Sequence, residues 1–181
     1  TGVTRIGSCA FYGCTALASV SIADTVTEIG EKAFLGCTSL YNVELPGSVV
    51  RVAEDAFRNC SSLEALTLNE GTVSLSMGAL EGCSSLSTMH VPASMTDLQM
   101  ASGTSMRDIY YSGTLAQWKE LDAACSITDK LPKGTSIHTS TVYAVSEVAT
   151  ILKGALTAEG DDRDSFRYDA AYLLQQIVGL S

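Results

Sequence analysis

Four copies of one short phrase recur in the first half of this sequence at a constant spacing. Each copy has Ala first, Phe or Leu second, Gly or Asn before a Cys, and Leu last; the copies begin at Ala10, Ala33, Ala56 and Ala79. A fixed short period predicts a solenoid, in which each repeat forms one coil and packs on its neighbours. Phe11, Phe34 and Phe57 should then stack as one interior column, with Leu80 completing it. Because a solenoid leaves a long ribbon of surface for contacts, the repeat favours recognition over catalysis.

A second apolar pattern follows each phrase and predicts a short strand. In the second repeat it consists of Leu40, Val43 and Leu45, and the turn Pro46-Gly47-Ser48 ends it. Alternating side chains are typical of a half-buried strand, so the strands of successive coils should stack as a parallel sheet. The equivalent apolar sets in the other repeats are Leu17-Val20-Ile22, Leu63-Leu66-Leu68 and Leu86-Met89-Val91.

A third part of each repeat carries the chain back across the coil. An apolar pair should point inward after each turn, and the stretch from Glu31 to Gly36 and its equivalents should form about two helical turns. A Gly or Asn in the left-handed conformation should close this stretch. The inward pairs are Val26 and Ile29, Val49 and Val52, Val73 and Leu75, and Met95 and Leu98.

The combined pattern resembles the BspA-type repeats of the leucine-rich repeat superfamily, whose signature is close to I-G-x-x-A-F-x-G-C-x-x-L-x-x-V-x-L-P. Residues 29–46 match it in one run, and the likeness continues through 108–114, 117–118 and 137–138. Together it covers residues 1 to about 142. The resemblance implies an α/β fold, a leucine-rich repeat solenoid of about five to six 23-residue coils stacking a parallel sheet. It also implies a secreted or surface-attached bacterial protein.

The regular spacing stops at about residue 114, where a closing segment should begin. Thr114 and Gln117 have the spacing of a capping box, which predicts a short helix through Trp118 and Leu121. Trp118 should then cover the open edge of the last coil. A turn and a last short strand at Ile137 should complete the segment.

Residues 143–181 change character and predict a small C-terminal pair of helices. One helix should start at Ser146 and the other at Asp169, with an acidic loop between them. This tail resembles a type I dockerin, which implies a cohesin-like partner for the segment.

The acidic loop of the tail departs from the spacing of a calcium loop. Arg163 or Asp164 stands where the loop needs Gly, so we expect neither a metal nor a cofactor there. The carboxylates that a calcium ion would use are those of Asp161, Asp162, Asp164 and Asp169.

Four of the six cysteines occupy the same position in successive repeats. Neighbours in such a column lie about 4.8 Å apart, which leaves a disulfide open, but parallel Cβ vectors favour reduced thiols buried in the core. Zinc fits the column poorly because no Cys-x-x-Cys pair is present. The column is Cys14, Cys37, Cys60 and Cys83, whereas Cys9 and Cys125 lie outside it and either can be exposed.

Charge and composition narrow the function further. The net charge is −9, and both the repeats and the tail hold more acidic than basic residues, so nucleic acid is not an expected partner. No run of about 20 apolar residues is present to insert into a membrane. The two histidines, His90 and His138, have no Ser, Cys or carboxylate at a catalytic motif spacing, so we expect no enzyme.

Strand alternation predicts two columns of outward side chains as a binding surface. Its Tyr110 end has the aromatic content of a binding hot spot, and a plain solvated sheet is the alternative interpretation. The columns are Ser19, Asn42, Ala65, Thr88 and Asp108, and Ser21, Glu44, Thr67, His90 and Tyr110.

The sequence therefore predicts an adhesin-like module, secreted or on the cell surface, that binds a protein or glycan of a host or neighbouring cell. The alternative is a structural subunit of an extracellular assembly that docks through its C-terminal helices. Residues 1–7 match the end of a preceding coil, so we expect a fragment of a longer protein whose other part carries any export signal.

Overall fold

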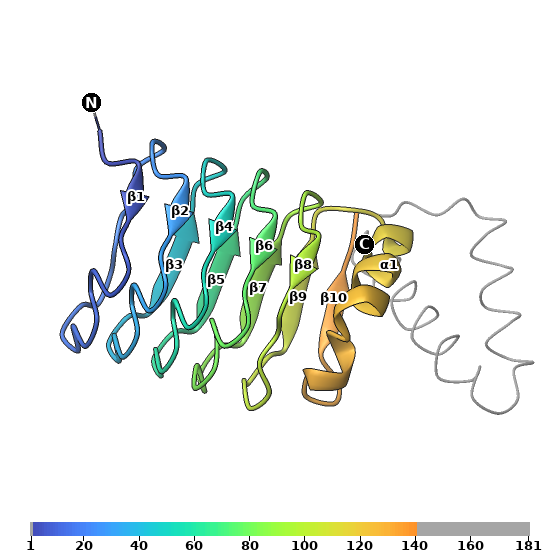
Figure 1. The fold of residues 1–181 in the computed structure, drawn as a ribbon. Helices are drawn as coiled ribbons and strands as arrows, with labels where there is room; N and C mark the ends of the chain where they lie inside the picture. The colour runs from blue at the N-terminus through green and yellow to red at the C-terminus, as the bar shows by residue number, and fades with distance from the viewer. Residues whose placement is uncertain (1, 141–181) are drawn as a thin grey trace, which may run out of the picture. The chain divides into compact units, whose positions relative to one another are not determined.

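The computed structural model describes residues 2–140, which form a solenoid of about five 23-residue turns with parallel sheets (Figure 1). This confirms the predicted fold of the repeats. The second part of the chain, 141–181, is a separate unit that lies outside the described residues. The predicted helical pair, the dockerin resemblance and the four aspartates of its loop belong to that part.

The strands form two five-stranded parallel sheets, and the second to fifth coils add strands to both of them. The first sheet has two-residue strands in the order β1-β2-β4-β6-β8, which are Arg5–Ile6, Glu28–Ile29, Arg51–Val52, Ser74–Leu75 and Asp97–Leu98. The second sheet has the order β10-β9-β7-β5-β3; from β3 to β10 its strands are Asn42–Leu45, Ala65–Leu68, Thr88–Val91, Asp108–Tyr111 and Ser136–His138. The second sheet is the one that the sequence predicts.

The strand predicted in the first coil is reduced to a single bridge between Ser19 and Asn42. Within the described residues this coil has a neighbour on one side only, so its ladder is incomplete. Its inward residues are correspondingly only half-buried, namely Phe11, Leu17, Val20 and Ile22.

Phenylalanine rings stack along the interior as predicted. Phe34 lies between Phe11 and Phe57, with ring centroids 5.1 and 5.2 Å away and planes within 4° of parallel. Leu80 continues the column, and Phe34, Phe57 and Leu80 are fully buried. The repeat register given by the sequence is therefore correct.

The segment from Glu31 to Gly36 is a series of turns, so the prediction of helical turns is wrong. Backbone N–H groups alternate between two kinds of acceptor: Ala33 N–H bonds within the coil to Gly30 O, but Phe34 N–H bonds to Ala56 O of the next coil. The bonds between coils use donors that a helix would need for itself. The predicted left-handed closing residues are confirmed, with positive φ at Gly13, Gly36, Asn59 and Gly82.

One interior residue differs from the prediction. Thr72 takes the place equivalent to Val26 and Val49, and it is fully buried, whereas the predicted Val73 is half-buried. Val73 follows the outward position of Val50, since its N–H donates to the Val50 carbonyl. The constant repeat length decides the inward position here, even though it places a polar residue there.

Three of the four column cysteines are buried thiols, as predicted. The Sγ atoms of Cys37, Cys60 and Cys83 donate to the carbonyl oxygens of Phe11, Phe34 and Phe57, at 3.1 to 3.2 Å. Cys14 is exposed, contrary to the prediction, because the first coil is covered on one side only in the described residues. All six cysteines are free thiols; Cys9 is exposed and Cys125 is buried.

Helix α1, Leu115–Cys125, closes the solenoid (Figure 1). Thr114 and Gln117 form the predicted capping box, and α1 packs against β8. Trp118 is 2% exposed and meets Tyr111 edge to face at 5.4 Å, which agrees with its predicted covering role. After a 3-10 helix, Thr128–Lys130, the chain adds β10 to the second sheet next to β9.

Candidate functional site

The outer face of the second sheet carries the predicted surface. Strand pairing aligns Asn42, Ala65, Thr88 and Asp108 in one column and Glu44, Thr67, His90 and Tyr110 in the other. Ser19 joins the first column through its bridge to Asn42, and Ser21 is exposed in the first coil. The structure thus brings the predicted residues to one face, including those of the fifth coil.

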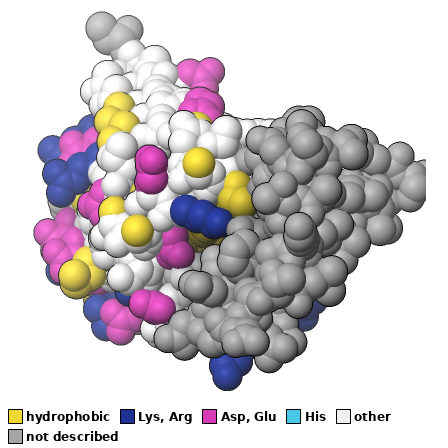
Figure 2. Space-filling model, turned by 90° about the vertical axis from the view of Figure 1, so that its right-hand side faces the viewer, with side chains coloured by type: hydrophobic (Ala, Val, Ile, Leu, Met, Phe, Trp, Pro, Cys, Tyr) yellow, Lys and Arg dark blue, Asp and Glu magenta, His cyan; other side chains and the backbone are white. Residues whose placement is uncertain are grey.

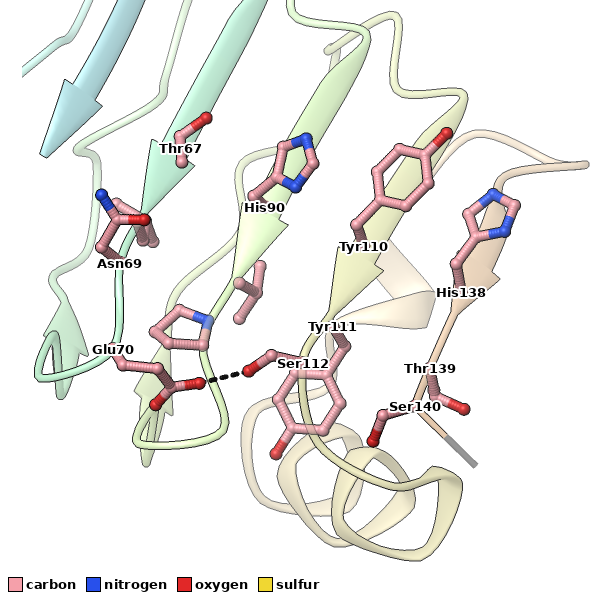
Figure 3. Close-up of a pocket in the computed structure, with 13 residues that line it drawn as sticks. Thr67, Asn69, Glu70, His90, Tyr110, Tyr111, Ser112, His138, Thr139 and Ser140 are labelled. Atoms are coloured by element: carbon pink, nitrogen blue, oxygen red, sulfur yellow. Dashed lines mark hydrogen bonds between the residues drawn. The ribbon is translucent and has the colours of Figure 1, made fainter. Parts of the chain in front are cut away.

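The second column continues to a residue that the sequence did not place on the surface. His138 on β10 pairs with Tyr110 on β9, as His90 on β7 does on the other side. The three rings stack, with centroids 4.8 Å apart for His90 and Tyr110 and 4.5 Å apart for Tyr110 and His138 (Figure 3). His138 also bonds through Nε2 to Asp108 Oδ1 at 2.9 Å. We call these three residues the ring ladder.

The ring ladder presents edges to solvent. Its rings lie within 14° of parallel and each face of Tyr110 is covered by an imidazole. Tyr110 is nevertheless 41% exposed, so its edge and hydroxyl group remain accessible (Figure 3). An edge offers hydrogen-bonding atoms, whereas stacking on a sugar ring needs a free aromatic face.

A hollow of about 330 Å³ lies beside the ring ladder and is bounded by the ends of the strands. All three ladder residues line it, together with Asn69, Glu70, Ser112 and other residues of the strand ends (Figure 3). The ladder and the polar residues therefore face one shared space.

Glu70 connects three coils at the edge of this hollow. Its carboxylate accepts hydrogen bonds from Ala93 N–H at 2.9 Å, from Ser94 N–H at 3.3 Å, and from the Ser112 hydroxyl (Figure 3). The bond from Ser112 is the main cause that lowers the pKa of Glu70 below its ordinary value, and the two backbone donors add to it. Glu70 is thus an ionised carboxylate held by neutral donors.

A second hollow, of about 680 Å³, adjoins the first and shares Asn69 and Glu70 with it. Asp24, Glu44 and Gly47 also line this space. Gly47 belongs to the second coil, which lies between the coils that carry Asp24 and Glu70. The amide of Asn69 donates to Glu44 Oε1 at 3.1 Å. We call Asp24, Glu44 and Glu70 with the space between them the carboxylate hollow.

Neither hollow is lined by Lys or Arg. Elsewhere in the described residues, carboxylates pair with cations, as in Arg5–Glu28 and Arg58–Glu81. Figure 2 shows basic and acidic side chains side by side on one face of the molecule. The two hollows differ from such a surface because their negative charge is not neutralised.

Other functions have less support in the described residues. No group of three or more His, Cys, Asp or Glu residues there can hold a metal ion. In the same part of the chain no helix has the length and apolar character needed to cross a membrane. Neither absence identifies a function.

The sequence of this chain also matches a known family of repeats. Residues 1–117 match the model of the BspA type leucine rich repeat region in six copies, so the chain belongs to this family. A leucine-rich repeat family of this kind typically has no catalytic function. Nothing in the comparisons supports the dockerin resemblance of the tail. The comparison with curated proteins gave no match.

Three solved bacterial structures are similar to this chain. The leucine rich repeat protein of T. pallidum has 29% identity and a TM-score of 0.55, over 60% of this chain and 52% of that one. A leucine-rich repeat protein of Bacteroides ovatus has 24% identity and a TM-score of 0.52, over 77% of this chain and 29% of that one. A leucine rich cell surface protein of Faecalibacterium prausnitzii has 24% identity and a TM-score of 0.46, over 67% of this chain and 33% of that one. The chain therefore spans about half of the first protein and less of the other two.

Proposed function

We propose that the outer face of the second sheet binds a protein, with the ring ladder at the centre of the contact. The observation that carries this proposal is the stack of His90, Tyr110 and His138 beside a hollow at the strand ends. Aromatic residues concentrate binding energy at protein interfaces when they sit beside a pocket. Tyr110 is the one large aromatic of the ladder and is the proposed hot spot.

The rings of the ladder are already held in place before a ligand binds, which supports their role in protein binding. Each ring is held by its neighbours and by the sheet, and His138 is further fixed by Asp108. Immobilising a side chain during association costs about 0.5–1.5 kcal/mol, and a side chain that is already held avoids much of that cost. A rigid row of polar edges suits hydrogen bonding to a peptide backbone.

The covered ring faces favour a protein over a glycan as the ligand. A sugar ring would need an open aromatic face, and both faces of Tyr110 are occupied by the two histidines. We further propose that the module works outside the cell, secreted or on the bacterial surface. Antibody labelling of intact cells, with permeabilised cells as the reference, tests that location; labelling only after permeabilisation would contradict it.

Binding of the whole chain to arrays of purified extracellular matrix proteins and to a glycan array tests the ligand class. We expect binding to a matrix protein that survives its enzymatic deglycosylation and weakens at least tenfold in Tyr110→Ala, because a hot-spot residue contributes about 2 kcal/mol or more. Tyr12→Ala is the matched control, since Tyr12 is a more exposed tyrosine, 58%, in the first coil. Equal binding by Tyr110→Ala and Tyr12→Ala, or binding to glycans alone, would contradict the proposal.

A further inference from the structure

We infer that acidification to about pH 5.5 releases the bound protein from the ring ladder, because His90 takes up a proton. This inference rests on the proposed function and adds its regulation. Its basis is a juxtaposition: the chain has two histidines, and both lie on the ring ladder, one on each face of Tyr110. Histidine is the side chain whose charge ordinarily changes between about pH 5 and 8. Acid in this range therefore acts on the proposed contact itself.

The two histidines differ in what balances a positive charge, and His138 has a carboxylate for this purpose. It bonds through Nε2 to Asp108 Oδ1 at 2.9 Å, and its side chain is 19% exposed. A carboxylate oxygen only accepts hydrogen bonds, so Nε2 carries a proton in both the neutral and the charged ring. Protonation of His138 therefore keeps this bond and turns it into an ion pair.

His90 has no such partner among the residues that the structure describes. Strand pairing places Thr67 of β5 on one side of His90 and Tyr110 of β9 on the other, and neither is a carboxylate. Asp108 stands diagonally across on β9, but its Oδ1 is engaged with His138. No ion pair joins His90 to an acidic residue of the described chain.

The ionisable groups of the two hollows do not supply a partner either. Glu70 of the carboxylate hollow also lines the space beside the ladder, but both of its oxygens accept hydrogen bonds from the turn after β7 and from the Ser112 hydroxyl. Glu44 stands in the column of His90 two strand spacings away, about 10 Å. Burial raises the pKa of Tyr111, so its phenol stays uncharged. Protonated His90 is therefore stabilised mainly by water.

Binding of a protein reverses that stabilisation. A partner that docks with the ladder at the centre of the contact removes water from the edge of His90, and burial disfavours a charged side chain. Protonation also turns the accepting nitrogen of the imidazole into a donor, so the ring no longer accepts from a peptide N–H group. The attraction of an imidazolium to the face of Tyr110 is present with and without the partner and cancels. Binding therefore favours neutral His90, and the affinity falls as the pH falls through the range in which imidazole titrates.

A pH titration of the free whole chain by NMR tests the first step without a protein ligand. We expect the imidazole signals of His90 to move between about pH 7.5 and about pH 5.5. The ring signals of Tyr110 should move with them, because the two rings are stacked. The signals of the buried Phe34 should stay constant, which verifies that the fold is unchanged. His90 signals that stay constant over this range would overturn the inference.

The array of purified matrix proteins, read at the same two pH values, tests the release. For a matrix protein whose binding requires Tyr110, we expect the affinity of the parent to be roughly tenfold lower at the acidic pH, as one proton must leave on binding. His90→Phe keeps a flat ring against Tyr110 but takes up no proton, so its affinity should change by less than about twofold. His138→Phe is the matched control on the other face of Tyr110 and should retain the full change. An unchanged unfolding midpoint verifies that both variants fold.

The outcomes separate this inference from the proposed function. If Tyr110→Ala abolishes binding near neutral pH but the parent binds equally well or better in acid, the inference fails and the proposed function stands. If His90→Phe shows the full loss of affinity in acid, the proton binds elsewhere in the chain or on the matrix protein, and the inference fails. If no matrix protein binds in a way that requires Tyr110, both fail.

Discussion

The ring of Phe34 lies almost parallel to the ring of Phe57, with centroids 5.2 Å apart and 3° between the planes. Both rings are fully buried, and the contact between Phe11 and Phe34 repeats this arrangement one coil earlier. Phe34→Ala removes one ring from the middle of the stack and leaves a cavity that the coils on either side cannot close. We expect this change to lower the free energy of unfolding by about 3–5 kcal/mol.

Denaturant unfolding of the whole chain measures this effect. Tyr12→Ala is the control, because its exposed side chain contributes no comparable packing and should change the free energy by less than about 0.5 kcal/mol. A loss below about 1 kcal/mol for Phe34→Ala would be inconsistent with the buried stack.

The buried hydroxyl of Thr72 predicts a stabilising substitution. Its Oγ1 has no hydrogen-bond partner in the described structure, and the residue is fully buried where other coils have Val26 and Val49. Burying a hydroxyl without a partner costs about 1–3 kcal/mol. Thr72→Val keeps the shape and removes that cost, so we expect it to raise the free energy of unfolding by about 1 kcal/mol.

The exposed Thr38 provides the comparison for this substitution. Thr38→Val should leave stability within about 0.5 kcal/mol of the parent, because its hydroxyl is solvated in both states. If Thr72→Val destabilises the protein instead, a bound water or another partner must satisfy the hydroxyl.

Thr72 also shows what the sequence could and could not predict. The constant repeat length predicted the coils, the long strands and the Phe column, because a repeated pattern averages out local exceptions. The prediction was wrong at Thr72, because we assigned the interior position to the apolar Val73 although the repeat length assigns it to Thr72. Counting one full repeat onward from Val49 would have found the interior position directly.

The residues of the candidate binding surface were predicted only as far as the constant repeat length continues. His90 and Tyr110 were placed correctly although the step between them is shorter than the repeat, because strand alternation carried the register. His138 was missed as a surface residue, since a long segment that includes α1 separates it from Tyr110. The first sheet was also missed, because its very short strands contain no alternation to detect.

The thiols should fall into two classes by reactivity. Cys9 and Cys14 are exposed, whereas Cys37, Cys60, Cys83 and Cys125 are buried. Burial raises the pKa of Cys83 to about 12 and raises that of Cys60 as well, so neither forms the reactive thiolate near neutral pH. Alkylation of the native protein, followed by mass spectrometry, should therefore modify Cys9 and Cys14 first.

At about pH 9 as at about pH 7, the buried column should stay protected from alkylation, because burial raises the pKa values of Cys60 and Cys83. Addition of denaturant should expose all the thiols together. Rapid native modification of Cys60 or Cys83, or a disulfide between Cys37 and Cys60, would contradict the observed burial.

The carboxylate of Glu70 should make stability depend on pH in the acidic range. Its pKa is lowered in the folded protein, mainly by the Ser112 hydroxyl, so folding favours the ionised form. The resulting contribution is present above the unfolded pKa, about 4.3, and is lost as pH falls through the lower folded pKa. Glu70→Gln removes the titration, so the stability difference between the parent and this variant should be constant near neutral pH and shrink below about pH 4.

Urea unfolding at a series of pH values measures that difference, and Glu54→Gln serves as the control because Glu54 is exposed in another part of the coil. Ser112→Ala should reproduce part of the effect, since it removes the largest cause of the lowered pKa while leaving the donors Ala93 and Ser94 in place. A difference between the parent and Glu70→Gln that grows as the pH falls would have the wrong sign for a depressed pKa. That result would mean that the folded protein raises the pKa of Glu70, with the removal of water from the carboxylate outweighing its hydrogen bonds.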